Sequence, residues 1–370
     1  MKSLPLVRPK SKGCKVKIMA DLKINSSDKM LIIQLAGIGD LVMASPTLRA
    51  LRAKYPNAKI AFLSLARTKD MIRHCPYIDR VFTFEEKLSP GTIWRNLQAI
   101  LKIRREHFDV AANLHNLYSS SGTAKMCFLL FLIKAKKTVG RNTNAKGAFY
   151  DVKVDDSMPL SKHQVECIMD VARALHCRAD NYKLEVWAPK EEDIHVFDFI
   201  EKESGAKGRF TIGINLGGIR PSRRWPVENF AKVADVLSEK YNAQIVITGS
   251  KSEIKLAQDM QRMMRATPII SSGVFSLTQL VAFIRRCDLF ISNDSGPMHI
   301  ANALEKPLVA IIGPGYPQVR PYNKQNCIVL KKEVACSPCY KFDCKSLECL
   351  KSIKVNDVLE AVTKLLPLRG

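Results

Sequence analysis

Small polar residues gather in the segment from Ser292 to His299, which contains a proline at its sixth position. This pattern is typical of a point where a strand ends and a helix begins. The first N–H groups of such a helix have no partner within it and favour an anion, so we predict that Ser295 and Gly296 cradle a phosphate or diphosphate. Asp294 would repel phosphate, and we expect its carboxylate to bind sugar hydroxyls. For His299, considered alone, a hydrogen-bonded core position is the favoured interpretation.

A second turn of interest contains Gly37, Gly39 and Asp40 and follows the apolar run at 31–35. Glycines at the end of a strand let the backbone approach a ligand closely, although the third glycine of a dinucleotide fingerprint is missing. A carboxylate beside a ligand pocket can take a proton from an attacking hydroxyl, so Asp40 is a candidate general base. Capping of the next helix is an equally good interpretation of Asp40.

Two charged positions in the second half also follow predicted strand ends. Arg223 lies in a basic loop that begins at Gly217. A guanidinium group can donate two parallel hydrogen bonds to phosphate oxygens. It could stabilise the charge of a leaving nucleoside diphosphate without a metal ion, although a solvated basic loop is the simpler alternative. Glu253 follows Gly249 and could hold a ribose diol through two hydrogen bonds. Helix capping is an equally good interpretation of Glu253.

Four cysteines lie close together near the C-terminus: Cys336, Cys339, Cys344 and Cys349. Four thiolates can bind zinc tetrahedrally. The spacing is compact for a structural zinc site, because such sites usually separate two pairs more widely. We therefore prefer reduced thiols in a packed loop at 336–349 and expect no metal, with zinc as the alternative.

Strand and helix patterns alternate through both halves of the chain. Strands are predicted at 31–35, 59–65, 210–216, 244–248, 288–292 and 308–312. Helices are predicted at 191–203, 228–241, 276–286 and 297–304, and another follows Asp40, with Ser45-Pro46 as its candidate start. The apolar run from Met126 to Ile133 is interpreted as a buried helix rather than a membrane contact. It is too short to span a bilayer.

This alternation predicts an α/β fold with two Rossmann-like domains, in which helices cover both faces of parallel sheets. Their ligand loops should face a shared central cleft, because ligands bind beyond the carboxyl ends of such strands. The predicted divisions are a basic, mostly disordered tail at 1–28, an N-terminal domain at 29–190 and a C-terminal domain at 191–370.

The chain of 370 residues has a formal net charge of +23. Most of the excess lies in residues 1–190, where 33 Lys and Arg stand against 16 Asp and Glu, a difference of +17. Such a field attracts polyanions, including nucleic acid, anionic lipid and phosphorylated glycolipid. The basic N-terminus has no apolar core like that of a secretory signal, and the 11 cysteines then favour a cytoplasmic protein with reduced thiols.

The order of these motifs resembles glycosyltransferase family 9, which includes the heptosyltransferases of lipopolysaccharide core assembly. The residues that carry the resemblance are Gly39-Asp40 with Pro46, Arg223 before Trp225-Pro226, Gly249-Ser250 with Glu253, Asn293 to His299, and Gly313-Pro314-Gly315. The resemblance covers the chain from about residue 30 onward. It implies the GT-B fold and an inverting transfer that needs neither metal nor other cofactor.

The resemblance also implies roles for single residues. Asp40 matches the general base, Arg223 stands where the family has a lysine that contacts the donor phosphates, and Glu253 matches the ribose contact. Asp294 matches a donor-sugar contact, and the N–H groups of Ser295 and Gly296 match the diphosphate cradle, with His299 in the same motif. The expected donor is a nucleotide-activated heptose of the ADP-heptose type. The expected acceptor is an anionic core glycolipid linked to lipid A.

On the acceptor side we expect Gly37 and Gly39 to line the pocket. Lys136, Lys137 and Arg141, with neighbouring lysines, form a candidate basic cluster that could grip carboxylates and phosphates of the acceptor. A solvated loop is the alternative for that cluster. Acting on such a glycolipid, the protein is expected in the cytoplasm, in peripheral contact with the inner membrane.

Two other functions remain open from the residues alone. One is a nucleotide-sugar epimerase on the same architecture, which would need no acceptor. The other is a basic nucleic-acid-binding protein, although none of the usual signatures is present and few aromatics stand among the basic residues.

Overall fold

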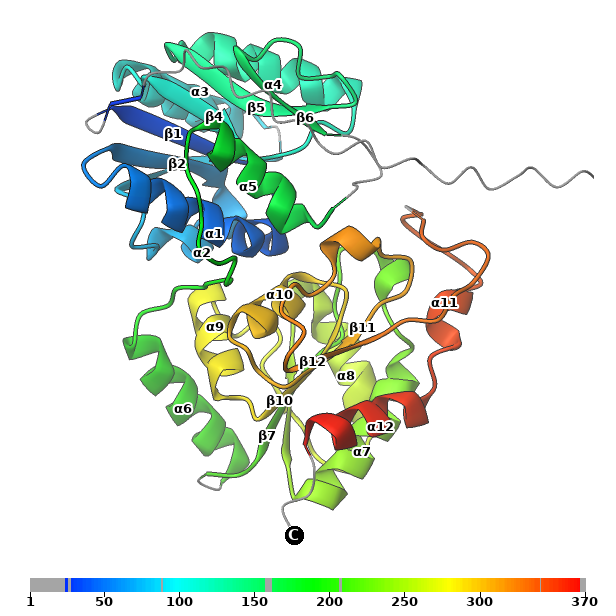
Figure 1. The fold of residues 1–370 in the computed structure, drawn as a ribbon. Helices are drawn as coiled ribbons and strands as arrows, with labels where there is room; N and C mark the ends of the chain where they lie inside the picture. Colours follow the sequence, from blue (N-terminus) through cyan, green and yellow to red (C-terminus); the bar gives the residue numbers. More distant parts are fainter. Residues whose placement is uncertain are drawn as a thin grey trace, which may run out of the picture.

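The computed structural model describes residues 24–25, 28–87, 89–156, 162–205, 208–339 and 341–366. They form two lobes, one above the other in Figure 1. The predicted tail at 1–28 lies almost wholly outside the described residues. Within the described residues, no helix combines the length and the apolar character that crossing a membrane requires.

The N-terminal lobe is built on a six-stranded parallel sheet in the order β3-β2-β1-β4-β5-β6. Its strands are β1 (Lys29–Gln34), β2 (Lys59–Leu65), β3 (Arg80–Phe84), β4 (Val110–Asn113), β5 (Lys137–Thr143) and β6 (Val152–Asp156). Helices α1 (Ile38–Lys54), α2 (Asp70–Arg73) and α5 (Gln164–Ala174) pack on one face. Helices α3 (Pro90–Arg105) and α4 (Ser120–Ile133) cover the other, which Figure 1 shows turned away from the C-terminal lobe.

The C-terminal lobe repeats this plan with the order β12-β11-β10-β7-β8-β9, again parallel throughout. Its strands are β7 (Thr211–Asn215), β8 (Gln244–Thr248), β9 (Ile269–Ile270), β10 (Leu289–Asn293), β11 (Leu308–Ile311) and β12 (Cys327–Leu330). Its helices are α6 (Glu191–Ser204), α7 (Val227–Tyr241), α8 (Ile254–Met263), α9 (Leu277–Arg286), α10 (Gly296–Ala303), α11 (Glu348–Lys351) and α12 (Val355–Leu365).

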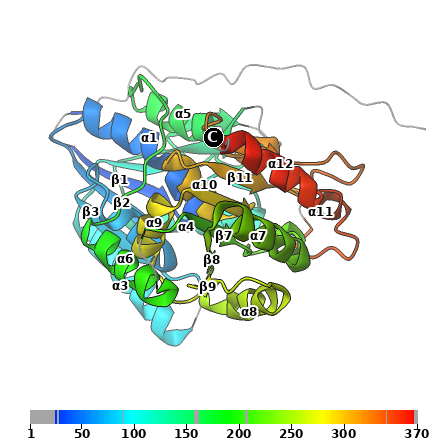
Figure 2. The same cartoon turned by 90° about the horizontal axis from the view of Figure 1, so that it is seen from below.

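Each sheet is sandwiched between helices, and the two lobes share part of their core. One apolar cluster lies under α7, α8 and α12, and another under α3 and α4. The third runs without interruption from α1 and α5 of the N-terminal lobe to α9 and α10 of the C-terminal lobe. Figure 2 shows the ribbon from below, with α9 and α10 of the C-terminal lobe in front of α1. The prediction of a GT-B architecture is therefore confirmed.

The strongest local signals in the sequence formed the predicted elements. The strands expected at 59–65 and 244–248 are β2 and β8. Ser276 caps α9 by accepting a hydrogen bond from the Gln279 backbone, while the Gln279 side chain accepts from the Ser276 backbone. This reciprocal pair satisfies two helix-end donors that would otherwise be unpaired.

The predicted start of the first helix at Ser45-Pro46 is wrong, because α1 begins at Ile38 and Pro46 lies inside it. Proline cannot donate the backbone hydrogen bond that the carbonyl of Val42 would receive. The Ser45 Oγ donates to that carbonyl instead, at 2.7 Å. The same hydroxyl accepts from the backbone N–H of Glu185 at 2.8 Å, so it also fastens the segment that leads to the second lobe.

The apolar run from Met126 to Ile133 is helical, as predicted, but it is not wholly buried. Met126, Leu129, Leu130 and Ile133 face the core. Phe128 and Phe131 are exposed on the outer side of α4. The run is apolar almost all round, so its composition could not indicate which side lacks a covering element.

Candidate active site

The predicted chemistry lies at the same place in both sheets. In each lobe the strand order reverses direction between two central strands, β1 and β4 or β7 and β10. Loops after such a pair diverge and leave room for a ligand beyond the carboxyl ends of the strands. Asp40 follows β1, and the segment that begins with Asp294 follows β10.

The two lobes meet where these segments begin, through a reciprocal glycine contact. A Cβ placed on Gly39 would lie 2.6 Å from Cδ2 of His299, and a Cβ placed on Gly296 would lie 2.8 Å from Cβ of Ile38. Neither glycine could carry a side chain without moving its neighbour. The absent side chains thus let the start of α1 touch the start of α10, which brings the turn of Asp40 against the predicted phosphate cradle.

Asp40 lies in the first turn of α1, among polar groups of its own lobe. Removal from water raises the pKa of its carboxyl group, whereas the nearby His115 and Arg141 lower it. The carboxylate also accepts hydrogen bonds from the backbone of Gly37 and the side chain of Gln164, which favour the charged form. The bond from Gly37 resembles helix capping, so the alternative interpretation of Asp40 describes one of its contacts and does not exclude the other role.

His115 is a neighbour of Asp40 that the sequence analysis missed. Burial lowers the pKa of His115, while the charge of Asp40 raises it, and the net direction is downward. Asn113, the last residue of β4, holds its loop: its side-chain amide donates to the carbonyl of His115 at 2.8 Å and to the hydroxyl of Tyr150 at 2.7 Å. Polar residues directly after a central strand were the signal that could have identified it.

The predicted basic cluster on the acceptor side is not one surface, and this prediction is wrong. Lys136 pairs with Asp109 at 2.7 Å, and Lys137 is the first residue of β5. Both therefore lie at the amino ends of the strands, opposite the edge that carries Asp40. Their exposure and spacing in the sequence could not reveal which edge of the sheet they occupy.

Arg141 lies near the other end of β5 and is completely buried, so it cannot belong to an exposed acceptor grip. Its Nε donates to Asp156 Oδ2 at 2.6 Å, and its Nη1 donates to Gln164 Oε1 at 3.1 Å. Because Gln164 in turn contacts Asp40, Arg141 positions a neighbour of the candidate base. A buried guanidinium group needs charged and polar partners of this kind.

Asp294 and Arg223 are brought together in the C-terminal lobe, with Arg223 Nη1 3.1 Å from Asp294 Oδ2. Burial raises the pKa of Asp294, and the charges of Arg223, Arg220 and Arg320 lower it. Gly315 makes room for this carboxylate, since a Cβ there would lie 2.6 Å from Asp294 Oδ2. Arg220 belongs to the same basic loop as Arg223, whereas Arg320 is not part of any motif in the sequence analysis.

The start of α10 presents backbone N–H groups that the helix itself cannot satisfy. The side chain of Ser295 does not cap them, because its Oγ accepts from Asn215 Nδ2 at 2.9 Å and donates to the carbonyl of Asn293. His299, one turn along, is buried, and burial lowers its pKa to about 4. It is therefore neutral at pH 7 and would not by its own charge attract or repel an anion.

Glu253 ties two loops of this lobe together. Its carboxylate accepts from the backbone N–H groups of Gly218 at 3.0 Å and Ser250 at 2.7 Å. The approach requires a glycine at 217, where a Cβ would lie 2.1 Å from Glu253 Oε1. The capping interpretation therefore describes contacts that exist, and the ribose contact stays a prediction.

Buried hydrogen bonds of Asn293 and Trp225 hold the loop that contains Arg223. Asn293 Oδ1 accepts from the backbone of Trp225 at 3.0 Å, and its amide donates to the carbonyl of Leu216 at 2.8 Å. The indole N–H of the buried Trp225 donates to the carbonyl of Ile353 at 3.0 Å. Asn293 thus links the ends of β7 and β10 to the residue two positions after Arg223.

The cysteine-rich loop supports the same loop from the side. Cys336, Cys339, Cys344 and Cys349 line one hollow together with Ser222 and Pro314. The Ser222 Oγ donates to the carbonyl of Lys341 at 2.6 Å, and the backbone of Cys339 donates to the carbonyl of Pro314 at 3.1 Å. In the described part of the chain, no group of three or more His, Cys, Asp or Glu side chains is arranged to hold a metal ion.

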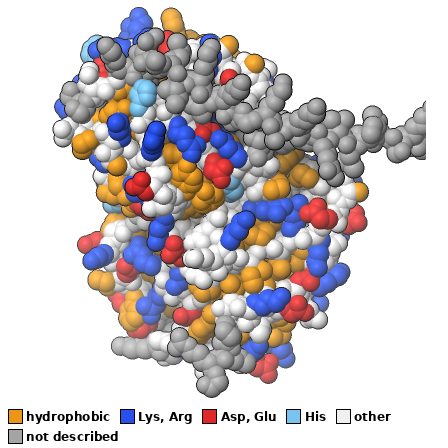
Figure 3. All heavy atoms as spheres, viewed as in Figure 1, with side chains coloured by type: hydrophobic (Ala, Val, Ile, Leu, Met, Phe, Trp, Pro, Cys, Tyr) orange, Lys and Arg blue, Asp and Glu red, His pale blue; other side chains and the backbone are white. Residues whose placement is uncertain are grey.

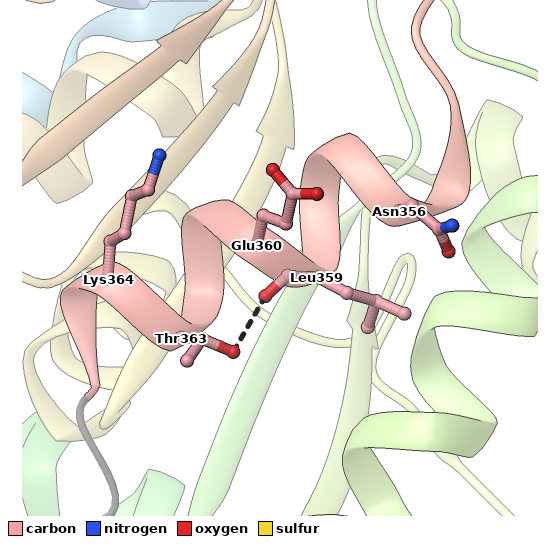
Figure 4. A pocket seen from close by; sticks show the side chains of 5 residues that line it. All are labelled: Asn356, Leu359, Glu360, Thr363 and Lys364. Atoms are coloured by element: carbon pink, nitrogen blue, oxygen red, sulfur yellow. Dashed lines mark hydrogen bonds between the residues drawn. The ribbon is translucent and has the colours of Figure 1, made fainter.

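Another hollow lies along α12, far along the chain from these motifs. Its lining side chains are Asn356, Leu359, Glu360, Thr363 and Lys364 (Figure 4). The hydroxyl of Thr363 donates to the carbonyl of Leu359 within the same helix, at 3.0 Å. All five residues belong to one helix and none belongs to a motif, so we assign this hollow no function.

Comparison with known proteins agrees with this arrangement. The sequence model described as "Glycosyltransferase family 9 (heptosyltransferase)" matches residues 96–350. Lipooligosaccharide heptosyltransferase 2 of Campylobacter jejuni is 27% identical over 346 residues, which are 89% of this chain and 96% of that protein.

Two solved structures show the same fold. The glycosyl transferase family 9 protein from Veillonella parvula superposes with a TM-score of 0.76 at 24% identity, covering 92% of this chain and 97% of that one. The ADP-heptose lps heptosyltransferase II of E. coli superposes with a TM-score of 0.72 at 22% identity, covering 91% and 98%.

Proposed function

The chain belongs to glycosyltransferase family 9, and on that premise we propose that it transfers a heptose from a nucleotide-activated donor to an anionic, lipid A-linked core acceptor. The similarity to a lipooligosaccharide heptosyltransferase supports the class of acceptor. The similarity of its fold to an ADP-heptose enzyme agrees with a donor of that type.

The reciprocal glycine contact is the observation that carries this proposal. It sets the turn that carries Asp40 in one lobe against a helix start of the other. In the proposed reaction the carboxylate of Asp40 takes the proton of the acceptor hydroxyl, whose oxygen attacks the anomeric carbon. The bond from that carbon to the diphosphate breaks, and attack from the opposite side inverts the anomeric configuration.

The C-terminal lobe supplies the groups that stabilise the departing nucleoside diphosphate. The N–H groups at the start of α10 favour the phosphate oxygens, and Arg223 adds a fixed positive charge. Figure 3 shows further Lys and Arg side chains on both lobes beside their junction. We propose that the N–H groups of α10 and Arg223 stabilise the negative charge of the leaving diphosphate without a metal ion. In this proposal Arg223 moves from Asp294 to the phosphates, and Asp294 orients the donor sugar.

The proposed base is tested by Asp40→Asn, which keeps the size of the side chain and removes its ability to accept a proton. We expect kcat to fall about 10²- to 10⁴-fold, the usual contribution of general base catalysis. Donor Kd, measured by calorimetry with ADP-heptose, should stay within a factor of two or so, because Asp40 belongs to the other lobe.

Asp180→Asn is the matched control, since Asp180 is an exposed carboxylate of the N-terminal lobe. It should keep the parent kcat. Near-normal turnover by Asp40→Asn would remove Asp40 from the role of base. Conversion of the donor sugar in the absence of any acceptor would instead support the epimerase and contradict glycosyl transfer.

We further propose that the protein works at the cytoplasmic face of the inner membrane as a peripheral protein. The support is the chemistry of the acceptor, whose lipid anchor keeps it in a bilayer. The excess of positive charge in the N-terminal half agrees with an anionic surface.

A further inference from the structure

The outer side of α3 and α4 exposes large apolar side chains that the fold does not use. We call this surface the α3–α4 face and define it by Ile93, Trp94, Leu97, Leu101, Phe128 and Phe131. Each of these side chains is between 44 and 68% exposed. On α3 the positions 93, 97 and 101 repeat at the spacing of one helix side, with 94 beside them.

The core of the lobe is complete without the α3–α4 face. Helix α3 buries Asn96, Ile100 and Ile103 against the sheet, and α4 buries a separate set of four apolar residues. The two helices lie side by side on the side of the sheet away from the C-terminal lobe (Figure 1). Isolated exposed apolar residues are common, whereas a group that shares one surface marks an interaction site.

The charged side chains that α3 and α4 themselves carry all have one sign. Helix α3 carries Arg95, Lys102, Arg104 and Arg105 and no acidic residue, and α4 carries Lys125 and no acidic residue. Among the described residues, Lys102, Arg104 and Arg105 form no ion pair. Arg104 and Arg105 follow Leu101 by three and four positions, so they extend the apolar stripe toward the end of α3.

This combination selects among the possible occupants. In a symmetric contact with a second copy, the cations of both copies would be brought into one interface, and neither α3 nor α4 offers a carboxylate to pair with them. A helix with aromatic and aliphatic residues on one side and Lys and Arg beside them instead fits the interface of an anionic bilayer. The apolar side chains enter the acyl boundary, and the cations meet lipid phosphates.

The position of α4 connects this face to the candidate active site. The residue Tyr118, two positions before α4, lies close enough to Asp40 for the carboxylate to raise the pKa of its hydroxyl, although burial is the larger cause. Phe128 and Phe131 then lie roughly 12 to 17 Å along the helix from its first residue. Helix α4 therefore links the loop beside Asp40 to the exposed phenylalanines of the face.

We propose that the α3–α4 face docks the protein on the surface of an anionic lipid bilayer. The docking stands on the apolar and basic side chains of the face, while its use in presenting the acceptor rests on the proposed function.

The test uses the full chain and sedimentation with vesicles of phosphatidylcholine, with or without phosphatidylglycerol. The parent protein should bind the anionic vesicles, and Trp94→Ser combined with Phe128→Ser and Phe131→Ser should lower the partition coefficient at least ten-fold. Ile194→Ser combined with Met263→Ser is the matched control, because these side chains are equally exposed on the C-terminal lobe. It should bind like the parent.

Two further measurements locate the contact. The emission of the parent should shift to the blue on anionic vesicles, and Trp94→Phe should remove that shift while binding persists. Of the other two tryptophans, Trp225 is already buried and the partly buried Trp187 packs against Tyr77 and the core shared by the two lobes. Replacing Lys102, Arg104 and Arg105 by Gln should weaken binding to anionic vesicles and reduce its dependence on salt.

Three results would overturn the docking proposal: no binding by the parent, equal binding by the triple serine variant, or a concentration-dependent dimer that the variant abolishes. The kinetics separate this proposal from the function. With a soluble, lipid-free acceptor, the triple variant should keep the parent kcat, whereas with acceptor embedded in vesicles its rate should fall at least ten-fold. Vesicle binding without glycosyl transfer would contradict the function and leave the docking intact.

Discussion

The surroundings of Asp40 have opposing effects on the pKa of its carboxyl group. Removal from water raises its pKa, and the positive field of Arg141 with two hydrogen bonds lowers it. The net direction is upward from the ordinary aspartate value. A base of this kind is stronger than a free aspartate, yet it must lose its proton before each turnover.

The pH profile should therefore respond to Gln164. Gln164→Leu removes a hydrogen bond that favours the charged carboxylate, so the pKa of Asp40 should rise further. Loss of activity on acidification should then begin at a higher pH than in the parent, when kcat/KM is measured across the acid limb. Gln258→Leu, at an exposed position on α8, should leave the acid limb of the profile where it is in the parent. An unshifted acid limb in Gln164→Leu would show that this hydrogen bond does not affect the pKa of Asp40.

The sequence indicated the residues that stand in motifs and missed those that come from distant segments. Asp40 and Asp294 were found because each follows a strand end and a turn of small residues. The burial of Arg141 could not be foreseen, since its partners Asp156 and Gln164 are 15 and 23 positions away. Only the pairing of β5 with β6 brings the first of them within reach.

At the scale of elements, α1 shows how one hydroxyl can allow a proline inside a helix. Ser45 donates to the carbonyl that Pro46 leaves without its usual partner, and it accepts from Glu185 in the connecting segment. Sequence rules for helix starts place serine and proline at the first turn. Here the same pair lies in the middle, because α1 already begins at Ile38.

A double-mutant cycle tests this account. Ser45→Ala should lower the free energy of unfolding by roughly 1–3 kcal/mol, because two buried backbone groups lose a partner. In the Pro46→Ala background the loss should be smaller, since the alanine N–H can bond to the carbonyl of Val42. Urea unfolding of the four proteins gives the coupling free energy between positions 45 and 46. An equal loss in both backgrounds would show that the Ser45 hydroxyl does not replace the hydrogen bond that Pro46 cannot make.

Periodicity and turn residues predicted the boundaries of β2, β8 and α9 to within one residue, whereas elements such as β4, β5, α3 and α5 were not predicted. The exposure of Phe128 and Phe131 was not predicted either, because an apolar helix carries no sign of which side remains uncovered. That information depends on what packs against α4, and the sheet covers only one of its sides.

At the scale of the whole molecule, the two sheets have the same strand order. The helices that follow β1 and β10, α1 and α10, contact each other, so the points at which the two strand orders reverse face one another. Gly39→Ala should disturb this junction, because its Cβ would lie 2.6 Å from the ring of His299. Such overpacking costs about 1–3 kcal/mol of stability, and we expect kcat/KM to fall about ten-fold or more as the lobes separate. Thermal unfolding and initial rates measure both effects.

Gly37→Ala is the control for stability, since no atom lies within 4 Å of the Cβ that it would add and the backbone there is extended. Adding His299→Ala to Gly39→Ala should restore part of the lost stability by vacating the occupied space. A Gly39→Ala protein as stable as the parent would show that the junction of the two lobes can accommodate the added methyl group without a loss of stability.

The reciprocal contact of Gly39 and Gly296 has a mechanical consequence. Because the contact lies beside the turn of Asp40 and the start of α10, a rotation of one lobe about it would pivot close to the proposed site and not at the outer edge of the molecule. Swinging one half about this point would widen the outer rim by much more than the spacing between carboxylate and cradle. Bulky substrates could then enter and leave while the atoms that must react keep their alignment.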